Sequence, residues 1–387
     1  MQPHSDAYLR LACLSYAEED DEAPRRAAAA ARVLAEHPEL TDTDPHVAAA
    51  ASDVDALAAI LDADPGAANR PGGPHDWPPL LYLCYARHDP ALDEAAVLRA
   101  ARLLLSSGAD PNASFHWRGL DPPFTALTGA LGGGERGQPP HPHAIALARV
   151  LLEAGAHPDD AQALYNRMFT ADDSHLELLF LYGLGSAAAL LRYQLRWAVT
   201  HGMTDRVRLL TAHGVDVTSP FDDGPTPAAL ALTCGYPEIV AALGVPAPEL
   251  APPDAFVAAA LAADHAACSR LRVAHPSVVA DLRAARPGLA VWAAAHGRPG
   301  AVALLLDAGW PVDALGRTDV PQDDPWQTAL HAAAEAGDVA LARELLARGA
   351  DSGVRDARFG ATPGDWARYF DQPAVAALLT PSEPSGS

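Results

Sequence analysis

The sequence predicts an all-α fold, a helical solenoid of about ten helix-turn-helix repeats joined by short turn fingers. Three observations lead to this prediction. Capping residues delimit a helix pair near the C-terminus, its closing glycine recurs at intervals that suit whole repeats, and three tryptophans share one position within the repeat. Because each helix is too short to be stable alone, such pairs must stack on their neighbours.

The helix pair lies in "QTALHAAAEAGDVALARELLARGADSGVRD", residues 327–356. Thr328 suits the N-cap of a first helix that begins near Leu330, and Gly337 suits its end. Asp338 can cap a second helix, which Gly349 terminates. Apolar residues at helical spacing give that second helix one apolar stripe: Val339, Ala342, Leu345 and Leu346.

The closing glycine of the second helix recurs along the chain in "GADPN", "GAHPD", "GVDVT" and "GWPVD", which begin at Gly108, Gly155, Gly214 and Gly309. The last three intervals, up to Gly349, are 59, 95 and 40 residues. These lengths suit two, three and one repeats of roughly 33 residues. The first helices open similarly, at Thr125, Thr226, Thr328 and Thr362.

These motifs resemble the ankyrin repeat, a turn and two helices whose first helix opens with T-P-L-H-x-A. "TALHAA" at Thr328 departs from that pattern at one main position, whereas the other copies are degenerate. Helix pairs can be placed end to end from Leu9 to Leu379, so the chain resembles a bacterial-type ankyrin repeat protein over almost its whole length.

The repeats predict one domain over residues 6–379, with an N-terminal capping unit (6–43), internal repeats (44–353) and a C-terminal capping unit (354–379). The polar residues 380–387 are expected to be a disordered tail, and the acidic run Glu18–Glu22 belongs to the N-terminal cap. Between residues 161 and 285 the repeat boundaries are not defined by the sequence.

Trp197, Trp292 and Trp366 occupy the same place relative to the end of the first helix in their repeats. A large aromatic residue at one repeated position indicates a repeated buried environment. We therefore expect these three side chains to belong to the core.

The composition excludes several functions. The chain contains no lysine, which excludes a Schiff-base lysine, a phosphate-loop lysine and a kinase lysine. The formal net charge of −22 argues against nucleic-acid binding, because the average surface repels a polyanion. An arginine-rich segment over residues 270–298 departs from this balance, either as a solvated helix face or as a docking patch for an acidic partner.

The cysteines and the N-terminus indicate a compartment. Four cysteines lie at scattered spacings within helix patterns, as expected for free, buried thiols in a reduced cytoplasm: Cys13, Cys84, Cys234 and Cys268. The N-terminus lacks the pattern of a signal peptide, and no apolar stretch is long enough to span a membrane. We expect a cytoplasmic monomer that does not bind membranes.

The resemblance implies that a partner binds the concave face, which is lined by the turn before each first helix and by the solvent-facing end of that helix. The matching turn residues here are Trp77, Phe115, Trp117, Phe124, Asp324 and Trp326, and the helix-end residues are Tyr85, His201, His296 and Tyr369. Aromatic residues are enriched among interface hot spots. The alternative for the turn tryptophans is that they pack beneath the neighbouring loop and bridge adjacent repeats.

The predicted function is a non-enzymatic scaffold for a protein or peptide partner, and the acidic surface would favour a basic one. One alternative is an inhibitory or immunity-type protein with a single specific target. Another is a metal-dependent hydrolase built on the insert 132–143, where His141 and His143 lie between prolines. The two histidines lack further ligands at metal-binding spacing, so we expect no metal and no cofactor.

Overall fold

The computed structural model describes residues 2–14, 23–87, 92–134, 138–222, 224–317 and 325–380. Its contacts divide the chain into two compact units. Unit 1 comprises residues 1–195 and 212–215, and unit 2 comprises residues 196–211 and 216–387. The acidic run Glu18–Glu22 and residues 381–387 of the expected tail lie outside the described residues.

In its described residues, unit 1 is mostly helical and contains one small hairpin. Its helices are α1 (Gln2–Ala12), α2 (Ala23–Glu36), α3 (Leu40–Thr43), α4 (Pro45–Ala51), α5 (Val54–Ala63), α6 (Pro79–Tyr85), α7 (Glu94–Ser106), α8 (Ala126–Leu131), α9 (Ala144–Glu153), α10 (Ala161–Arg167) and α11 (Ser174–Leu181). Strands β1 (Ser114–Phe115) and β2 (Phe124–Thr125) form the hairpin, and the short 3₁₀ helices are η1 (Pro65–Asn69), η2 (Gly73–His75), η3 (Trp117–Gly119) and η4 (Leu184–Ser186). Helices α12 (Ala188–Thr200) and α13 (Thr204–Ala212) are divided between the two units.

In the described residues of unit 2, all the regular elements are helices. They are α14 (Pro227–Thr233), α15 (Pro237–Leu243), α16 (Pro252–Leu261), α17 (His265–Ala274), α18 (Val278–Ala285), α19 (Leu289–Ala295), α20 (Pro299–Asp307), α21 (Ala329–Ala336), α22 (Val339–Ala347), α23 (Pro363–Tyr369) and α24 (Pro373–Leu379). The predicted all-α class is confirmed.

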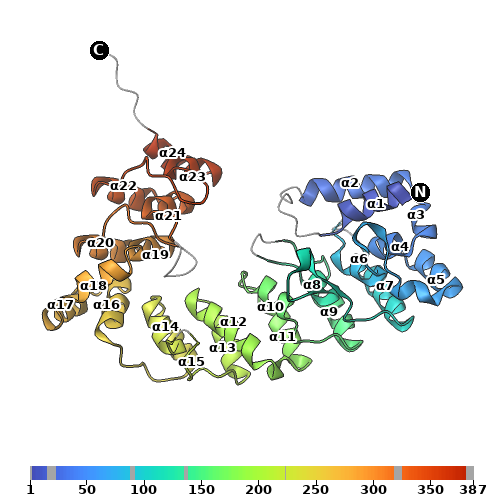
Figure 1. Cartoon of the computed structure of the whole chain (residues 1–387), viewed down its shortest axis with the longest axis horizontal. Coiled ribbons are helices and arrows are strands. Elements are labelled where there is room, and N and C mark those ends of the chain that lie inside the picture. The colour runs from blue at the N-terminus through green and yellow to red at the C-terminus, as the bar shows by residue number, and fades with distance from the viewer. Residues whose placement is uncertain are drawn as a thin grey trace, which may run out of the picture. The chain divides into compact units, whose positions relative to one another are not determined.

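Within each unit the helices pack in chain order (Figure 1). In unit 1, α4 contacts α6, α6 contacts α8 and α8 contacts α10, while α5, α7, α9 and α11 form a parallel row in the same order. In unit 2, α19 contacts α21, α21 contacts α23 and α22 contacts α24. Each helix therefore covers its apolar face with the corresponding helix of the next pair, as stacked repeats require.

The capping residues act as their local chemistry predicts. The hydroxyls of Thr125, Thr226, Thr328 and Thr362 each accept a hydrogen bond from an early backbone N–H of α8, α14, α21 and α23. Gly337 ends α21 in the left-handed conformation, and the carboxylate of Asp338 accepts from the Leu341 N–H to cap α22. The five glycines that close a second helix all have φ between 76° and 99°, which only glycine adopts without strain.

The predicted tryptophan core is only partly correct. Trp292 is fully buried and Trp366 is buried, but Trp197 is half-buried. Its ring stacks against His201, with ring centroids 3.7 Å apart, at the solvent-facing end of α12. The three tryptophans therefore occupy the same position in their repeats, but how far each side chain is buried depends on the neighbouring helix.

Asparagine side chains join successive loops at the end of the second helices in unit 1. The Asn69 amide donates to the Gly108 carbonyl and accepts from the Asp110 N–H. One repeat later, the Asn112 amide donates to the Gly155 carbonyl and accepts from the His157 N–H. Each asparagine satisfies two backbone groups of the following repeat, which fixes the spacing of the two loops.

The His331 ring takes part in the capping box at the N-terminus of α21. It is buried, its Nδ1 accepts from the Thr328 N–H, and its Nε2 lies 3.1 Å from the Ala361 carbonyl oxygen. Burial holds the pKa of His331 below its usual range. A proton on Nδ1 of His331 would also point at the Thr328 N–H, so that two hydrogen-bond donors would face each other.

A buried base with a lowered pKa binds protons better when the chain unfolds, so its stabilising effect is complete above pH 6.5 and is lost below it. We expect that acidification from pH 7.5 to 5.5 lowers the free energy of unfolding of α21 by no more than about 1.4 kcal/mol through protonation of His331. His331→Gln preserves the capping box without a titrating ring and should remove this part of the pH dependence. Amide hydrogen exchange in α21 at both pH values provides the measurement. Equal pH dependence in both proteins would contradict the prediction.

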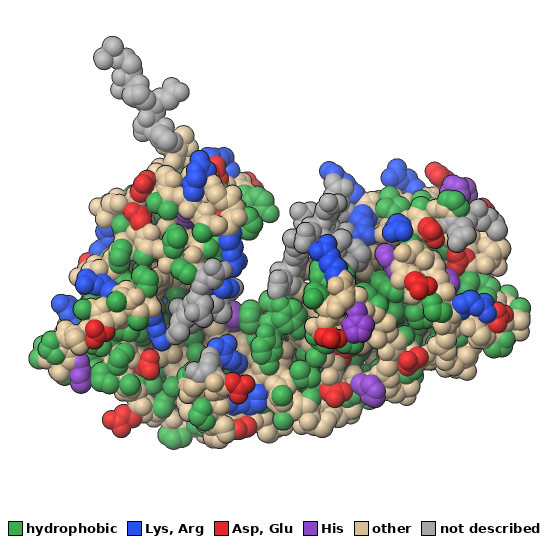
Figure 2. All heavy atoms as spheres, viewed as in Figure 1, with side chains coloured by type: hydrophobic (Ala, Val, Ile, Leu, Met, Phe, Trp, Pro, Cys, Tyr) green, Lys and Arg blue, Asp and Glu red, His purple; other side chains and the backbone are tan. Residues whose placement is uncertain are grey.

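Acidic and basic side chains are interspersed on the face shown in Figure 2. Within the described ranges, no helix combines the length and apolar character needed to cross a membrane. The charge of this face is therefore mixed rather than uniformly acidic.

Candidate partner-binding surface

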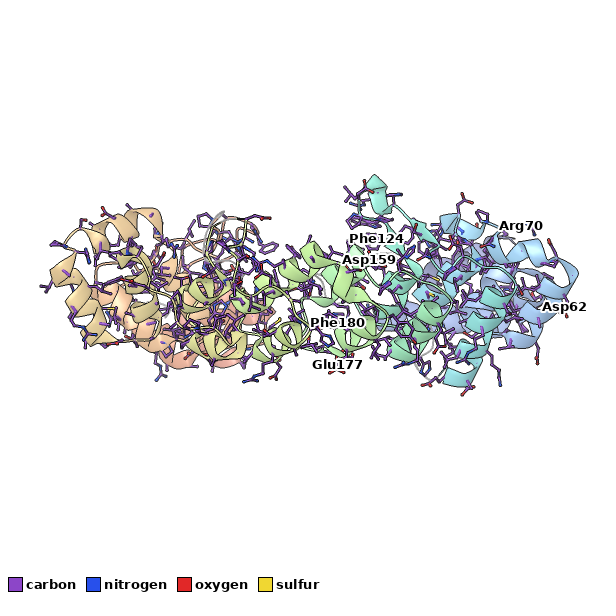
Figure 3. The ribbon with its side chains drawn as sticks, turned by 90° about the horizontal axis from the view of Figure 1, so that it is seen from below. Asp62, Arg70, Phe124, Asp159, Glu177 and Phe180 are labelled. Atoms are coloured by element: carbon purple, nitrogen blue, oxygen red, sulfur yellow. The ribbon has the colours of Figure 1, made fainter. Side chains whose placement is uncertain are left out.

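The most distinctive surface feature of unit 1 is a finger formed by residues 113–125. Its two strands pair antiparallel, with Ser114 opposite Thr125 and Phe115 opposite Phe124. The Ala126 N–H donates to the Ala113 carbonyl and closes the base. The finger that carries Phe124 stands out from the row of helices in Figure 3.

An aromatic cluster joins the finger to the preceding repeat. The Phe115 ring lies 4.4 Å from the Trp77 ring and 5.6 Å from the Phe124 ring, measured between centroids. Tyr85 lies 5.5 Å from Phe115, and Trp117 lies 6.5 Å from Phe124. The structure thus brings together five residues that the sequence had assigned separately to turns and a helix end.

Three members of this cluster are buried, although the sequence predicts accessible positions for them. Trp77 is 5% exposed, Phe124 is 7% exposed and Tyr85 is 0% exposed, so the predictions of two surface turn residues and a solvent-facing helix end are wrong. The Tyr85 ring packs directly over Gly129, where any side chain would collide with it, and its hydroxyl donates to the Thr125 carbonyl. Trp77 bridges adjacent fingers, which was the alternative for turn tryptophans. Both residues pack beneath the surface and support it.

The tip of the finger carries the accessible side chains. The Arg118 guanidinium lies over the Trp117 ring, 4.7 Å from its centroid, and Leu120 is 56% exposed. His116 and Asp121 approach to 3.2 Å across the turn. Trp117 is half-buried and so rests on the cluster while presenting part of its ring. A preformed aromatic and apolar tip of this kind loses little conformational freedom on binding.

Asp160 anchors the base of the finger to α10. Its carboxylate accepts hydrogen bonds from the hydroxyls of Thr125 and Thr128 and from the Ala163 N–H. Burial raises the pKa of Asp160 above its usual range, although these hydrogen bonds oppose that shift. One buried side chain therefore caps α10 and fixes the last strand of the finger.

In unit 2, the predicted helix-end residues His201 and His296 each pack against a tryptophan of their own helix. The His296 ring stacks on Trp292 with centroids 3.8 Å apart, in the same way that His201 stacks on Trp197. Tyr236 lies 6.2 Å from His296. Burial lowers the pKa of His296, and repulsion from His201 lowers it further. Both histidines are half-buried, so each exposes one ring edge.

Trp326 lies at a second aromatic turn. It is half-buried, 5.3 Å from the Trp366 ring and 5.9 Å from the Phe359 ring, and Arg358 lies over it at 4.6 Å. Phe359 is 74% exposed and was missed from the sequence. It stands in the turn before Thr362, so the rule that selected Phe124 and Trp326 could also have selected it.

The remaining predicted residues are dispersed. Tyr369 is exposed at the end of α23, beside Phe370. Asp324 lies outside the described residues. Trp310, which follows the closing glycine Gly309 and was not among the predicted site residues, is buried and donates from its Nε1 to the Arg286 carbonyl, so it is a core residue.

The arginines of residues 270–298 lie on several elements. Arg283 donates to the Gly309 carbonyl, Arg286 lies 3.9 Å from Asp254, and Arg298 lies over the Tyr236 ring. Arg270 and Arg272 are exposed on α17. Three of these five side chains thus connect one element of unit 2 to another.

The two histidines of the insert have structural contacts. The Nδ1 atom of buried His141 accepts from the His143 N–H, and Nε2 of His143 lies 2.6 Å from the Leu92 carbonyl oxygen. The ring centroids are 5.9 Å apart. In the part of the chain that the structure describes, no three His, Cys, Asp or Glu side chains are grouped so that they could hold a metal ion.

The family model for the ankyrin repeat matches residues 326–357. This segment contains Trp326, the Thr328 cap, α21 and α22. No curated protein matches the sequence. Ankyrin repeats are typically non-enzymatic interaction modules, so the matched repeat suggests a role in protein interaction.

Proposed function

We propose, from the ankyrin repeat at residues 326–357, that this chain is a non-enzymatic scaffold that holds a protein or peptide partner. In this proposal, about ten ankyrin-like repeats over residues 6–379 form one solenoid, and the partner lies along its concave face. The chain acts as a cytoplasmic monomer whose acidic surface favours a basic partner.

The observation that carries the proposal is the finger tip in unit 1. Trp117, Arg118 and Leu120 present aromatic, cationic and apolar groups next to one another. The stacked rings of Phe115, Phe124 and Trp77 support them from below. Aromatic residues and arginine are enriched in interface hot spots, and Leu120 is exposed beside them.

Site-specific crosslinking tests this surface. A photoreactive benzoylphenylalanine would replace Leu120 at the tip or, as a matched control, Arg149, which is exposed on α9. Irradiation in the source cells should give a discrete protein adduct from position 120 and none from position 149. Mass spectrometry then identifies the partner, and the number of partners separates a single-target inhibitor from a scaffold.

The same partner, once purified, should bind a Trp117→Ala variant about tenfold or more weakly. The substitution removes a half-buried ring from the tip but leaves the rings of Trp77 and Phe115 in contact. Calorimetric titration gives the affinity, and circular dichroism checks that helicity is kept. Unchanged affinity together with adducts from both positions would disprove the proposed surface.

A further inference from the structure

Two hollows lie side by side along the finger in unit 1. The first has a volume of about 480 Å³ and is lined by residues of the finger and of the loop before α10, among them Asn112, Thr125, His157, Asp159 and Asp160. The second, of about 360 Å³, lies over α10 and α12. Pro122 and Ala161 line both, so the two hollows adjoin each other, and we refer to the pair as the groove.

The first hollow favours a cation. Asp159 is exposed there, and Figure 3 shows it next to the base of the finger that bears Phe124. No lysine or arginine is among the residues described as lining this hollow. Asp160 uses its oxygens for Thr125, Thr128 and Ala163, so Asp159 supplies the accessible carboxylate.

The second hollow favours an apolar side chain and one hydrogen-bond donor. Its wall includes Leu164, Leu190, Tyr165 and Tyr193, the last of which is 47% exposed. Gln194 also lines it and is 1% exposed. Its amide nitrogen donates to the Leu164 carbonyl, but its buried Oε1 accepts no hydrogen bond. An unused buried acceptor beside a hollow is suited to a donor from a ligand.

We propose that this groove binds an extended peptide segment with an arginine and an apolar residue two positions apart. In an extended chain, side chains at positions i and i+2 point to the same side and lie roughly 6–7 Å apart. The arginine enters the first hollow and pairs with Asp159. The apolar side chain packs on Leu190 and Tyr193, and a ligand N–H reaches Oε1 of Gln194. This inference rests on the proposed function and specifies which side chains the partner would present to the groove.

The test is a selection from a phage-displayed library of random heptapeptides on the full chain. Enriched peptides should share arginine with an apolar residue two positions away. For the best peptide, fluorescence polarisation should show about tenfold weaker binding to Tyr193→Ala and about threefold to fivefold weaker binding to Asp159→Asn. Citrulline in place of arginine should weaken binding to the wild type but not to Asp159→Asn.

Glu153→Gln is the matched control, because it also neutralises one exposed carboxylate but lies outside the groove. Its affinity should stay within about twofold of wild type, as for a surface charge without a partner. Absence of enrichment, enrichment without arginine, or equal losses in Asp159→Asn and Glu153→Gln would each overturn the inference. If the adduct at position 120 persists in any of these cases, the proposed function stands and only the groove assignment fails.

Discussion

Replacing Trp292 with alanine is expected to lower the free energy of unfolding of unit 2 by about 3–5 kcal/mol. The indole is fully buried on α19, and its Nε1 donates to the Cys234 carbonyl oxygen at the end of α14, 3.3 Å away. The substitution would leave a large cavity and an unpaired carbonyl. Because repeats are stabilised by their neighbours, the damage should extend to the helices packed on α19.

Trp292→Phe provides the matched control. It keeps most of the buried apolar volume and loses the hydrogen bond, so we expect a loss of about 1–2 kcal/mol. Urea unfolding followed by circular dichroism gives the free energies. Amide hydrogen exchange should locate the loss of protection in α14 and α19. Equal stability of the alanine variant and the wild type would show that Trp292 is not part of the core.

Replacing Asp160 with alanine is expected to destabilise unit 1 by about 2–4 kcal/mol. The variant loses the N-cap of α10 and leaves the fully buried Thr128 hydroxyl without its acceptor. The second strand of the finger should also become more mobile, because Thr125 loses the same carboxylate. Asp160 is thus expected to control both stability and the order of the binding surface.

Asp160→Asn separates charge from hydrogen bonding. The asparagine amide oxygen can still accept from the Ala163 N–H. The amide is neutral, so it also avoids the cost of burying a charge, which is the cost that raises the pKa of the native Asp160 carboxyl. We expect this variant to stay within about 1 kcal/mol of wild type. Urea unfolding and hydrogen exchange over residues 113–125 measure both effects. A larger loss for asparagine than for alanine would contradict this account of the anchor.

The parts of the fold that depend on local chemistry could be predicted from the sequence. Thr328, Gly337 and Asp338 define helix ends because each satisfies backbone groups only a few residues away. Because such caps recur along the chain, they predict the helix pairs without any information on the contacts between helices. The number of repeats and their assembly into one solenoid remain predictions.

The candidate surface was harder to predict, because exposure is decided by residues distant in sequence. Tyr85 is buried by Gly129, and Trp77 by Phe115 of the next finger. The sequence identifies these residues as aromatic members of turns and helix ends but does not show which neighbour covers them. The groove beside the finger forms because α12 lies close to Pro122, and neither segment of the sequence contains a pattern that predicts this proximity.

The asparagine links between loops bear on how such a chain can evolve. Asn69 contacts Gly108 and Asp110 of the following repeat, and Asn112 makes the same two kinds of bond with Gly155 and His157. Because these two junctions use the same chemistry, duplication or deletion of the repeat between them would leave compatible neighbours on both sides. Genes encoding this architecture could therefore change length by whole repeats without inventing a new junction, and recombination within the loops would be tolerated better than recombination within helices.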